Sequence, residues 1–458
     1  MSINDSILNS VGLTDKNIKF LISDNGDFNE LVTLGHDQHQ VLRYRATLTT
    51  VPEHCPQCGF LLSGHFYLAG TDTASYKLPT ANGYQQILLL TKQRYQCLRC
   101  KNTFIAQSKD FMSNSTISRP LLHQIIDLAK RDISEKDIAY ILHISHSKVN
   151  RLLHHAAKAY RTNYTKSLPT VICVDEVLYA KHHYGFEMIN GTTSDLIEIF
   201  PTRTSIDIRR YLSNYDLSNR QRVQYVVTDM NANYSAPLRV MFPNAQIIID
   251  RFHIIQLAMK AVQSTRITLQ RTINNKRSRV YKLLKSNWQF FITDQSKIDS
   301  TQPRWFKGIN EYLYPQDALQ LIFGLSPKFK QDYKIYQAVL RAQRSRSFDE
   351  FSVILSQYKP SHSAMDQVIL TYKKNLKSIR NAFLQKPSNG RIEGINRRIK
   401  QIGRTAYGYG NSLNYFFRIR LQLFNRKHIN ASFINLLTKK TCESDKIIRF
   451  TSYISQTL

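Results

Sequence analysis

The sequence predicts a multidomain chain of the α+β and α/β classes, in which small modules precede a mixed-sheet core. Three observations carry this prediction. Two C-x-x-C pairs stand within the first hundred residues. Apolar residues then recur at helical spacing between 115 and 165. From Pro169 onward, short β-branched runs alternate with helical stretches, and several of these runs end on aspartates, which is typical of a mixed α/β sheet.

The composition of the 458 residues is that of a folded, strongly basic protein. Hydrophobic residues make up 42% and aromatic residues 11%, which excludes a disordered chain. The 63 Lys and Arg against 33 Asp and Glu give a net charge of +30. This charge favours nucleic acid as partner, the alternative being a basic housekeeping protein such as a ribosome-associated factor. Because no apolar run is long enough for a membrane span and no signal peptide is apparent, we expect a cytoplasmic protein without a membrane partner.

Shifts in pattern divide the chain into seven segments. We expect a lead-in (1–45), a zinc ribbon (46–110), a helix-turn-helix DNA-binding domain (115–165), the first part of the sheet core (168–253), a helical insertion (254–384), the C-terminal helices of the core (385–427) and a tail (428–458).

The two C-x-x-C pairs predict a metal site. Cys55 and Cys58 form the first pair, and Cys97 and Cys100 form the second. Four thiolates in two such pairs suit a tetrahedral ion, and the usual occupant is one structural Zn²⁺. The flanking strand-like runs fit a zinc ribbon. The simplest role for the metal is to hold this small domain together. That role is compatible with DNA contact, because a structural zinc site often supports a binding surface.

The helical segment that follows reads as a helix-turn-helix. Ser134 and Asp137 suit a capping box at the start of one helix, and a second helix begins after Ser145. The residues expected to point outward on this second helix, and so to contact DNA, are His146, Ser147, Lys148, Asn150 and Arg151. The alternative is a plain three-helix structural bundle.

Five strands are expected in the core, and three of them lead to acids. The strands are 170–177, 184–190, 196–200, 223–228 and 246–249. The first carries Asp175 near its end, the fourth leads to Asp229 and the fifth to Asp250. We expect Asp250 to cap the following helix, although it could also be a fourth ligand. We favour a structural role for His253.

A basic helix over 391–402 carries the third acid. Glu393, Asn396, Arg397 and Lys400 share one face at helical spacing. A carboxylate in a basic face fits a metal ligand beside DNA phosphates, which Arg397 and Lys400 would contact. The alternative is an ion pair between Glu393 and Arg397 on a solvated face.

Asp175, Asp229 and Glu393 together suit phosphodiester chemistry. Clustered carboxylates hold two Mg²⁺ (or Mn²⁺) ions, which neutralise the phosphate and activate the nucleophile. Because adjacent parallel strands end at the same sheet edge, Asp175 and Asp229 should meet there, with Glu393 presented by a packed helix. Trp288 and Trp305 lie in the helical insertion; a core or interface role is favoured over stacking on an exposed base.

The motifs CPQCG, YQCLRCKNTF, VDE, VVTDMNANY, IIIDRFHIIQ and NGRIEGINRRIKQIGRTAYGY occur in this order. In this combination the chain, over about 45 to 425, resembles DDE transposases of the ISL-three family of bacterial insertion sequences. The resemblance implies an RNase H-like core, a DDE triad of Asp175, Asp229 and Glu393, and recognition of terminal inverted repeats by the N-terminal modules. A bacterial, nucleoid-associated location follows from it.

The expected function is therefore DNA cleavage and strand transfer, carried out by a dimer or higher oligomer that holds two double-stranded element ends. Two alternatives remain. One is a nuclease or resolvase with the same kind of core but no strand transfer. The other is a non-catalytic DNA-binding derivative, against which the three intact acids argue.

Overall fold

The computed structural model describes residues 2–23, 26–34, 39–112, 115–159, 167–180, 183–230, 235–406 and 408–423. The expected tail (428–458) lies outside these residues. By internal packing the chain divides into two units, Met1–Arg161 with Ile399–Leu458, and Thr162–Arg398. The division falls inside helix α15 (Gly390–Thr405).

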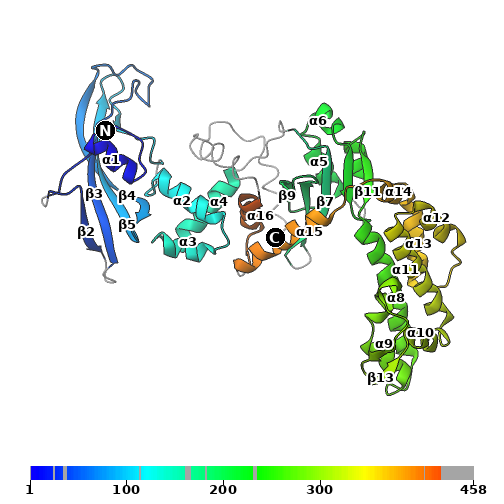
Figure 1. Cartoon of the computed structure of the whole chain (residues 1–458). Coiled ribbons are helices and arrows are strands. Elements are labelled where there is room, and N and C mark those ends of the chain that lie inside the picture. The colour runs from blue at the N-terminus through cyan, green and yellow to red at the C-terminus, as the bar shows by residue number, and fades with distance from the viewer. Residues whose placement is uncertain are drawn as a thin grey trace. The chain divides into compact units, whose positions relative to one another are not determined.

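A six-stranded sheet forms the N-terminal part of the first unit, beside the short helix α1 (Ile3–Ser10) (Figure 1). Its strands are β1 (Ile18–Phe20), β2 (Asn29–Leu34), β3 (His39–Leu48), β4 (Phe66–Ala81), β5 (Tyr84–Cys97) and β6 (Thr103–Ile105). The long β4–β5 hairpin turns at Asn82 and Gly83, whose φ angles are 52° and 81°. Asn-Gly is the favoured pair for such a turn because both residues tolerate positive φ.

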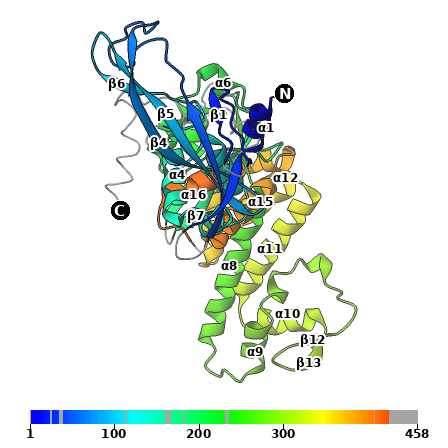
Figure 2. The same ribbon diagram turned by 90° about the vertical axis from the view of Figure 1, so that its left-hand side faces the viewer.

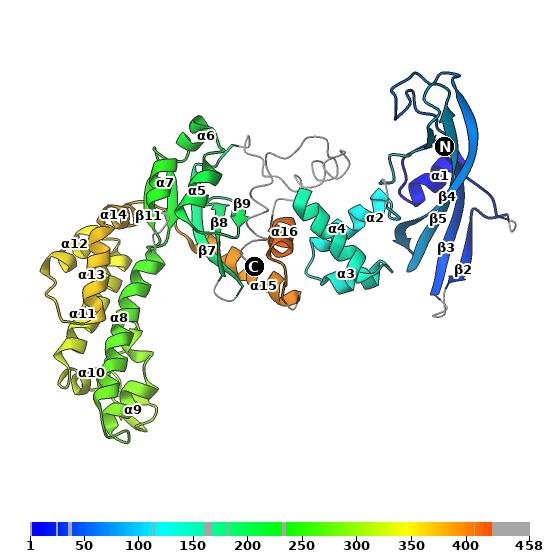
Figure 3. The same cartoon turned by 180° about the vertical axis from the view of Figure 1, so that it is seen from behind.

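Helices α2 (Arg119–Ala129), α3 (Glu135–Ile141) and α4 (His146–Ala159) follow this sheet. The expected capping box is present, since Ser134 and Asp137 bond each other's backbone N–H groups at the start of α3. Helix α16 (Ser412–Leu423) also belongs here (Figure 3), because its Phe417 and Leu421 share a buried cluster with the three helices. The sequence had suggested α16 as part of the sheet core.

The second unit contains a five-stranded sheet in the order β11–β10–β7–β8–β9. The strands are β7 (Val171–Ala180), β8 (His183–Asn190), β9 (Leu196–Phe200), β10 (Tyr225–Thr228) and β11 (Gln246–Ile249). Strands β11, β10 and β7 are parallel, whereas β7, β8 and β9 are antiparallel. The sheet is therefore mixed, as the sequence predicts, and β7 is its central strand.

The two faces of β7 are covered by different helices. Ile172 and Val174 belong to a buried cluster with residues of α5 (Ser205–Leu212) and α7 (Ser235–Met241); α6 (Leu217–Gln221) lies between them in sequence. Side chains alternate along a strand, so Cys173 and Asp175 point to the opposite face. There Cys173 Sγ lies 3.7 Å from the backbone oxygen of Ser388, just before α15.

Residues 251–384 are mainly helical, as expected. The elements are α8 (Arg251–Thr272), α9 (Arg279–Ser286), the 3-10 turns η1 (Phe290–Ile292) and η2 (Gln295–Lys297), strands β12 (Arg304–Phe306) and β13 (Glu311–Leu313), and helices α10 (Pro315–Phe323), α11 (Pro327–Ser345), α12 (Phe348–Gln357), α13 (Ala364–Lys374) and α14 (Leu376–Leu384). Figure 2 shows α8 and α11 running side by side, with β12 and β13 at the end away from the sheet.

Helix α14 packs along edge strand β11, where the side chain of Asn381 donates to the backbone oxygen of Ile247 over 2.9 Å. This contact covers an otherwise open sheet edge. None of the described helices is long and apolar enough to cross a lipid bilayer.

Candidate metal and catalytic site

The register of two parallel strands places Asp175 beside Asp229. Val171, Ile172 and Cys173 of β7 pair with Tyr225, Val226 and Val227 of β10. Asp175 is two residues beyond the last pair on one strand, and Asp229 is two residues beyond it on the other. The two acids therefore occupy equivalent positions on neighbouring parallel strands. Because side chains alternate along a strand, the two carboxyl groups lie on the same face and toward the same end of the sheet.

Asp250 occupies the corresponding position after β11. Its backbone N–H donates to the oxygen of Thr228 over 2.9 Å, so it stands next to Asp229. It is the N-cap residue of α8 but makes no side-chain cap hydrogen bond. Its carboxylate instead lies 3.3 Å from His253 Nδ1 and accepts the backbone N–H of Asn389 over 3.2 Å. Asp250 therefore occupies the expected N-cap position, but its carboxylate bonds these two partners instead of the first backbone N–H groups of the helix.

The electrostatics of this strand end reflect crowded acids. Burial raises the pKa of Asp175 to about 6, and the negative charge of Asp229 adds to the rise. The hydrogen bond with Asp250 raises the pKa of His253, and the charges of Asp229, Asp250 and Asp175 act in the same direction. The leading causes differ, burial for Asp175 and the hydrogen bond for His253, but both shifts favour a retained proton. A divalent cation would satisfy the same demand.

Helix α15 reaches the site through Asn396. Its side-chain nitrogen donates to Asp175 Oδ2 over 3.1 Å. Glu393, one turn earlier on the same face, is exposed and lies 3.6 Å from Arg397. Among the described residues, the one group of three or more His, Cys, Asp or Glu whose ligand atoms all lie within 4.8 Å is the four cysteines. The structure thus brings Asp175, Asp229 and Asn396 together, while the carboxylate of Glu393 faces Arg397.

One acid at this face was missed by sequence reasoning. Glu187 of β8 is the antiparallel partner of Asp175 and has 0% exposure. Neither of its carboxylate oxygens has a hydrogen-bond partner within the described residues. Burial raises its pKa well above the usual range, and the charge of Asp175 adds to the effect. The cross-strand pairing, which the sequence does not reveal, was the missing signal.

The oxygen donors at this place suit a magnesium-type ion. Asp175 and Asp229 offer the carboxylate oxygens that Mg²⁺ prefers. A cation there would also interact favourably with the two carboxylate oxygens of Glu187, which have no hydrogen-bond partner within the described residues. Glu176 is not part of this set: it points to the other face and is ion-paired with Arg203. The residues therefore fit the ion that the sequence predicts.

The four cysteines form a second site, in the first unit. Cys55 Sγ lies 3.7 Å from Cys100 Sγ, and Cys58 Sγ lies 3.9 Å from Cys97 Sγ. Four sulfurs about 2.3 Å from a central zinc would be roughly 3.8 Å apart, which matches these separations. The backbone N–H of Cys58 lowers the pKa of the Cys55 thiol to about 7, which favours a thiolate ligand. The cluster is compatible with zinc.

The expected DNA-contacting residues of α4 are not equally available. His146, Ser147 and Arg151 are exposed. Asn150 is half-buried, and its side chain donates to Glu135 of α3 over 2.9 Å. Lys148 is also half-buried, and burial lowers its pKa. The side chain of Asn150 therefore joins two helices, and its expected contact with DNA stays a prediction.

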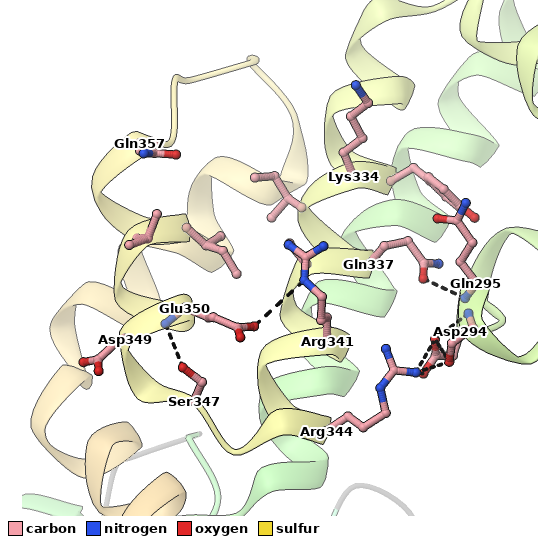
Figure 4. A pocket seen from close by; sticks show the side chains of 16 residues that line it. Asp294, Gln295, Lys334, Gln337, Arg341, Arg344, Ser347, Asp349, Glu350 and Gln357 are labelled. Carbon is pink, nitrogen blue, oxygen red and sulfur yellow. Dashed lines mark hydrogen bonds and ion pairs between the residues drawn. The ribbon is translucent and has the colours of Figure 1, made fainter.

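The helical region contains a cavity of about 980 Å³ between η2, α11 and α12 (Figure 4). Its charged side chains are largely paired with one another: Arg344 lies 3.1 Å from Asp294, and Arg341 lies 3.9 Å from Glu350. The two tryptophans lie elsewhere in this region and are not in the core, since Trp288 is 42% and Trp305 is 49% exposed. Of the favoured core or interface role, the core part is therefore wrong, and the interface part stays a prediction.

Comparison with known proteins places these features in a family. Residues 172–419 match the model of the ISL-three (ISL3) transposase family. The chain is 23% identical over 255 residues to a transposase for insertion sequence element IS1001 from Bordetella parapertussis, covering 54% of this chain and 60% of that protein. It is also 29% identical over 134 residues to a protein named ATP-dependent protease from Lactococcus lactis subsp. lactis, covering 29% of this chain and 42% of that protein.

The chain spans less than two thirds of either relative. The family match begins within the strand that carries Asp175 and continues through Asp229, Glu393 and Asn396. Since this match covers more than half of the sequence, the chain belongs to the ISL-three family of DDE transposases.

Proposed function

We propose that the protein binds the terminal inverted repeats of an insertion sequence and catalyses metal-dependent DNA cleavage and strand transfer. One observation carries the catalytic part. Asp175 within β7 and Asp229 just after β10 stand in matching register on adjacent parallel strands, and Asn396 of α15 is bonded to Asp175. A carboxyl group on the central strand, oriented by a neighbouring amide and next to a second carboxyl group, forms a preorganised site for oxygen-binding cations.

The proposed ligands are Asp175, Asp229 and Glu393, holding two Mg²⁺ or Mn²⁺ ions. When bound, these ions supply charge neutralisation at the phosphate and activation of the attacking oxygen. Asn396 fixes the orientation of the Asp175 carboxylate. The hydrogen bond with Asp250 raises the pKa of His253, and the protonated form of its ring would offset part of the negative charge beside it.

Two displacements at phosphorus make up the proposed reaction. In the first, a water oxygen bonds to the phosphorus at the element's end, the bond to the 3′ oxygen breaks, and that oxygen leaves with a proton. In the second, the new 3′-hydroxyl bonds to a phosphorus of target DNA and displaces the target's 3′ oxygen. Each step forms one P–O bond and breaks another, so no oxidant or external energy source is needed.

Glu393 completes this proposal by a change of partner. It lies on the same helical face as Asn396, and within the described residues its side chain is held by an exposed ion pair with Arg397. Such exposed pairs contribute little free energy. We propose that Glu393 leaves Arg397 for the cation when DNA binds, while Arg397 turns to a phosphate. The nearby Asp250 is the alternative third ligand.

DNA recognition is assigned to the N-terminal modules. His146, Ser147 and Arg151 of α4 would contact DNA from the start of that helix, together with Lys148. Lys400 adds positive charge on α15. Because two element ends must be joined to one target, the proposed active complex is a homodimer or higher oligomer on double-stranded DNA.

The test uses the full chain, DNA carrying the element's ends, target DNA and Mg²⁺. We expect strand cleavage and covalent joining by the unaltered protein, and loss of both by Asp175→Ala and Asp229→Ala, with end binding retained. Glu393→Gln against Asp250→Asn distinguishes the two candidates for the third ligand. Cleavage by Asp175→Ala at the unaltered rate would overturn the catalytic assignment.

Two other outcomes correspond to the alternative functions. Metal-dependent cleavage without joined products would identify a nuclease of the same core type. End binding without cleavage under any metal or DNA condition would identify a DNA-binding derivative.

A further inference from the structure

The hairpin of β12 and β13 presents two aromatic side chains to solvent. Trp305 pairs with Tyr312 across the strands, and their ring centroids are 5.2 Å apart in an edge-on arrangement. Trp305 is 49% and Tyr312 is 69% exposed, whereas the adjacent Phe306 is fully buried. Side chains alternate across the hairpin, so one face serves the core and the other carries an exposed aromatic pair.

This aromatic pair sits on a firm support. Asn287, just after α9, donates from its side chain to the backbone oxygen of Lys307 over 2.8 Å. The ring of Phe306 packs against Phe290 with centroids 5.1 Å apart. Gly308, with a φ of +89°, allows the turn to approach α9, since a Cβ there would lie 2.5 Å from Ser286 Oγ. The exposed rings are thus preorganised, which reduces the entropy lost on binding a partner.

The surroundings of the pair are strongly basic. Residues 266–314 contain ten Lys and Arg but three Asp and Glu. One of those three, Glu311, is ion-paired with Arg279. Exposed cations on the hairpin and the adjoining α9 include Arg304, Lys307, Lys282 and Lys285. A protein partner with an apolar patch would need no such charge, whereas a polyanion with flat rings matches both features.

Flat rings on a polyanion are available only where DNA bases are unpaired. In a duplex the base faces are covered by their neighbours in the stack, so a duplex could use the cations but not the rings. Stacking of a base on an aromatic side chain is independent of base identity, because every base has a π face. We propose that the β12–β13 hairpin binds unpaired DNA bases, with Trp305 and Tyr312 as the stacking surface.

The choice of DNA as the polyanion rests on the proposed function, in which cleavage at an element's end provides single-stranded or unstacked nucleotides. The hairpin would then hold such nucleotides while the acids act. Its binding does not require the acids, magnesium or cleavage, so it can be tested separately from catalysis.

The chain has two tryptophans, which provides a matched pair of fluorescent reporters. In the full-length Trp288→Phe variant the remaining signal comes from Trp305, and in Trp305→Phe it comes from Trp288. Both are titrated, in magnesium-free buffer, with a single-stranded oligothymidylate and with a blunt duplex of equal length. We expect the single strand to quench Trp305 strongly and Trp288 little, and the duplex to quench neither strongly.

Affinity provides the second measurement. Trp305→Ala and Tyr312→Ala should each weaken binding of the single strand about tenfold. Binding of the blunt duplex should stay within about twofold, and Trp305→Phe should retain most of the single-strand affinity. Leu370→Ala, at an apolar position of α13 that is 59% exposed, controls for loss of any exposed apolar side chain.

Equal quenching of Trp305 by duplex and single strand, or unchanged single-strand affinity in Trp305→Ala, would overturn the proposal. Loss of self-association in Trp305→Ala, with unchanged DNA binding, would assign this face to a second copy of the chain. If Asp175→Ala cleaves DNA normally while Trp305 still reports stacking, only the catalytic proposal fails.

Discussion

Asn396 Nδ2 donates to Asp175 Oδ2 over 3.1 Å, which bonds a helix far downstream in the chain to the central strand of the sheet. The two residues are 221 positions apart. The same helix is anchored at its start, where the backbone N–H of Asn389 donates to Asp250. The helical region between Asp250 and Asn389 therefore begins and ends at the same place, beside the acidic residues of the sheet.

Asn396→Ala should slow catalysis without weakening DNA binding. The variant leaves Asp175 without the amide that orients it, and a misplaced ligand lowers the rate of a preorganised site. We expect cleavage to fall about 10- to 100-fold, a range typical of lost outer-shell partners of a metal ligand. Single-turnover cleavage and end binding are measured in parallel. Arg398→Ala on the same helix is the control, since it removes charge but not this bond. An unchanged cleavage rate in Asn396→Ala would contradict the orienting role.

The stability of the protein in magnesium-free buffer should depend on the ionisation of Asp175. Its pKa is about 6 in the folded state against 3.8 for the ordinary side chain, so the folded state holds this proton more tightly than the unfolded state. The contribution to stability is full below pH 3.8 and is lost as the pH rises through about 6. The loss amounts to about 3 kcal/mol at most.

Asp175→Asn keeps an oxygen that can accept from Asn396 but cannot ionise, so it should lack this pH dependence. Denaturant unfolding of both proteins at several pH values between 4 and 8 measures the difference, which includes the effect of Asp175 on its neighbours His253 and Glu187. If the free energy of unfolding varies with pH in the same way for both proteins, the predicted rise in the pKa of Asp175 is refuted. Added Mg²⁺ at neutral pH should stabilise the unaltered protein more than Asp175→Asn.

Glu187→Met should stabilise the protein in magnesium-free buffer. The carboxyl group of Glu187 is fully buried, and its oxygens have no hydrogen-bond partner in the described part of the chain. An apolar side chain of similar length removes that desolvation penalty, a gain of about 1–3 kcal/mol in the free energy of unfolding. Mg²⁺ should narrow the difference in unfolding free energy between the two proteins. A cation bound at Asp175 would stabilise the ionised form of the buried Glu187 carboxyl group.

Glu198→Met on β9 is the matched control for this variant. Glu198 is 1% exposed, but its carboxylate accepts the backbone N–H of Ile199 over 2.9 Å. Its replacement should therefore destabilise the protein. If both methionine variants shift stability in the same direction, the unpartnered oxygens of Glu187 are not the cause.

Cys97→Ser should lose the bound metal of the cysteine site and weaken end-specific DNA binding. Cys97 is fully buried, and its sulfur lies 3.9 Å from Cys58 Sγ, so a shorter hydroxyl cannot replace it as a ligand. Zinc content by elemental analysis should fall from one per chain to near zero, while the second unit stays folded. Cys173→Ser, a substitution in the second unit, should leave the zinc content at one per chain. One zinc per chain in Cys97→Ser would contradict the four-cysteine site.

The sequence by itself determined the local elements and the chemistry they carry. Short β-branched runs predicted all five strands of the second sheet, because strand preference and burial are encoded residue by residue. The paired C-x-x-C motifs predicted the cysteine cluster, since ligand identity and close spacing largely specify such a site. The order of motifs identified the family.

Only the tertiary structure decided which side chains meet. Pairing of β7 with β8 placed Glu187 opposite Asp175, and packing of α15 chose Asn396 rather than Glu393 as the partner of Asp175. Packing also directed the Asp250 side chain away from the backbone of α8, assigned α16 to the first unit and left Trp305 exposed. These outcomes depend on strand register and on contacts between residues distant in sequence, which no local pattern of residues specifies.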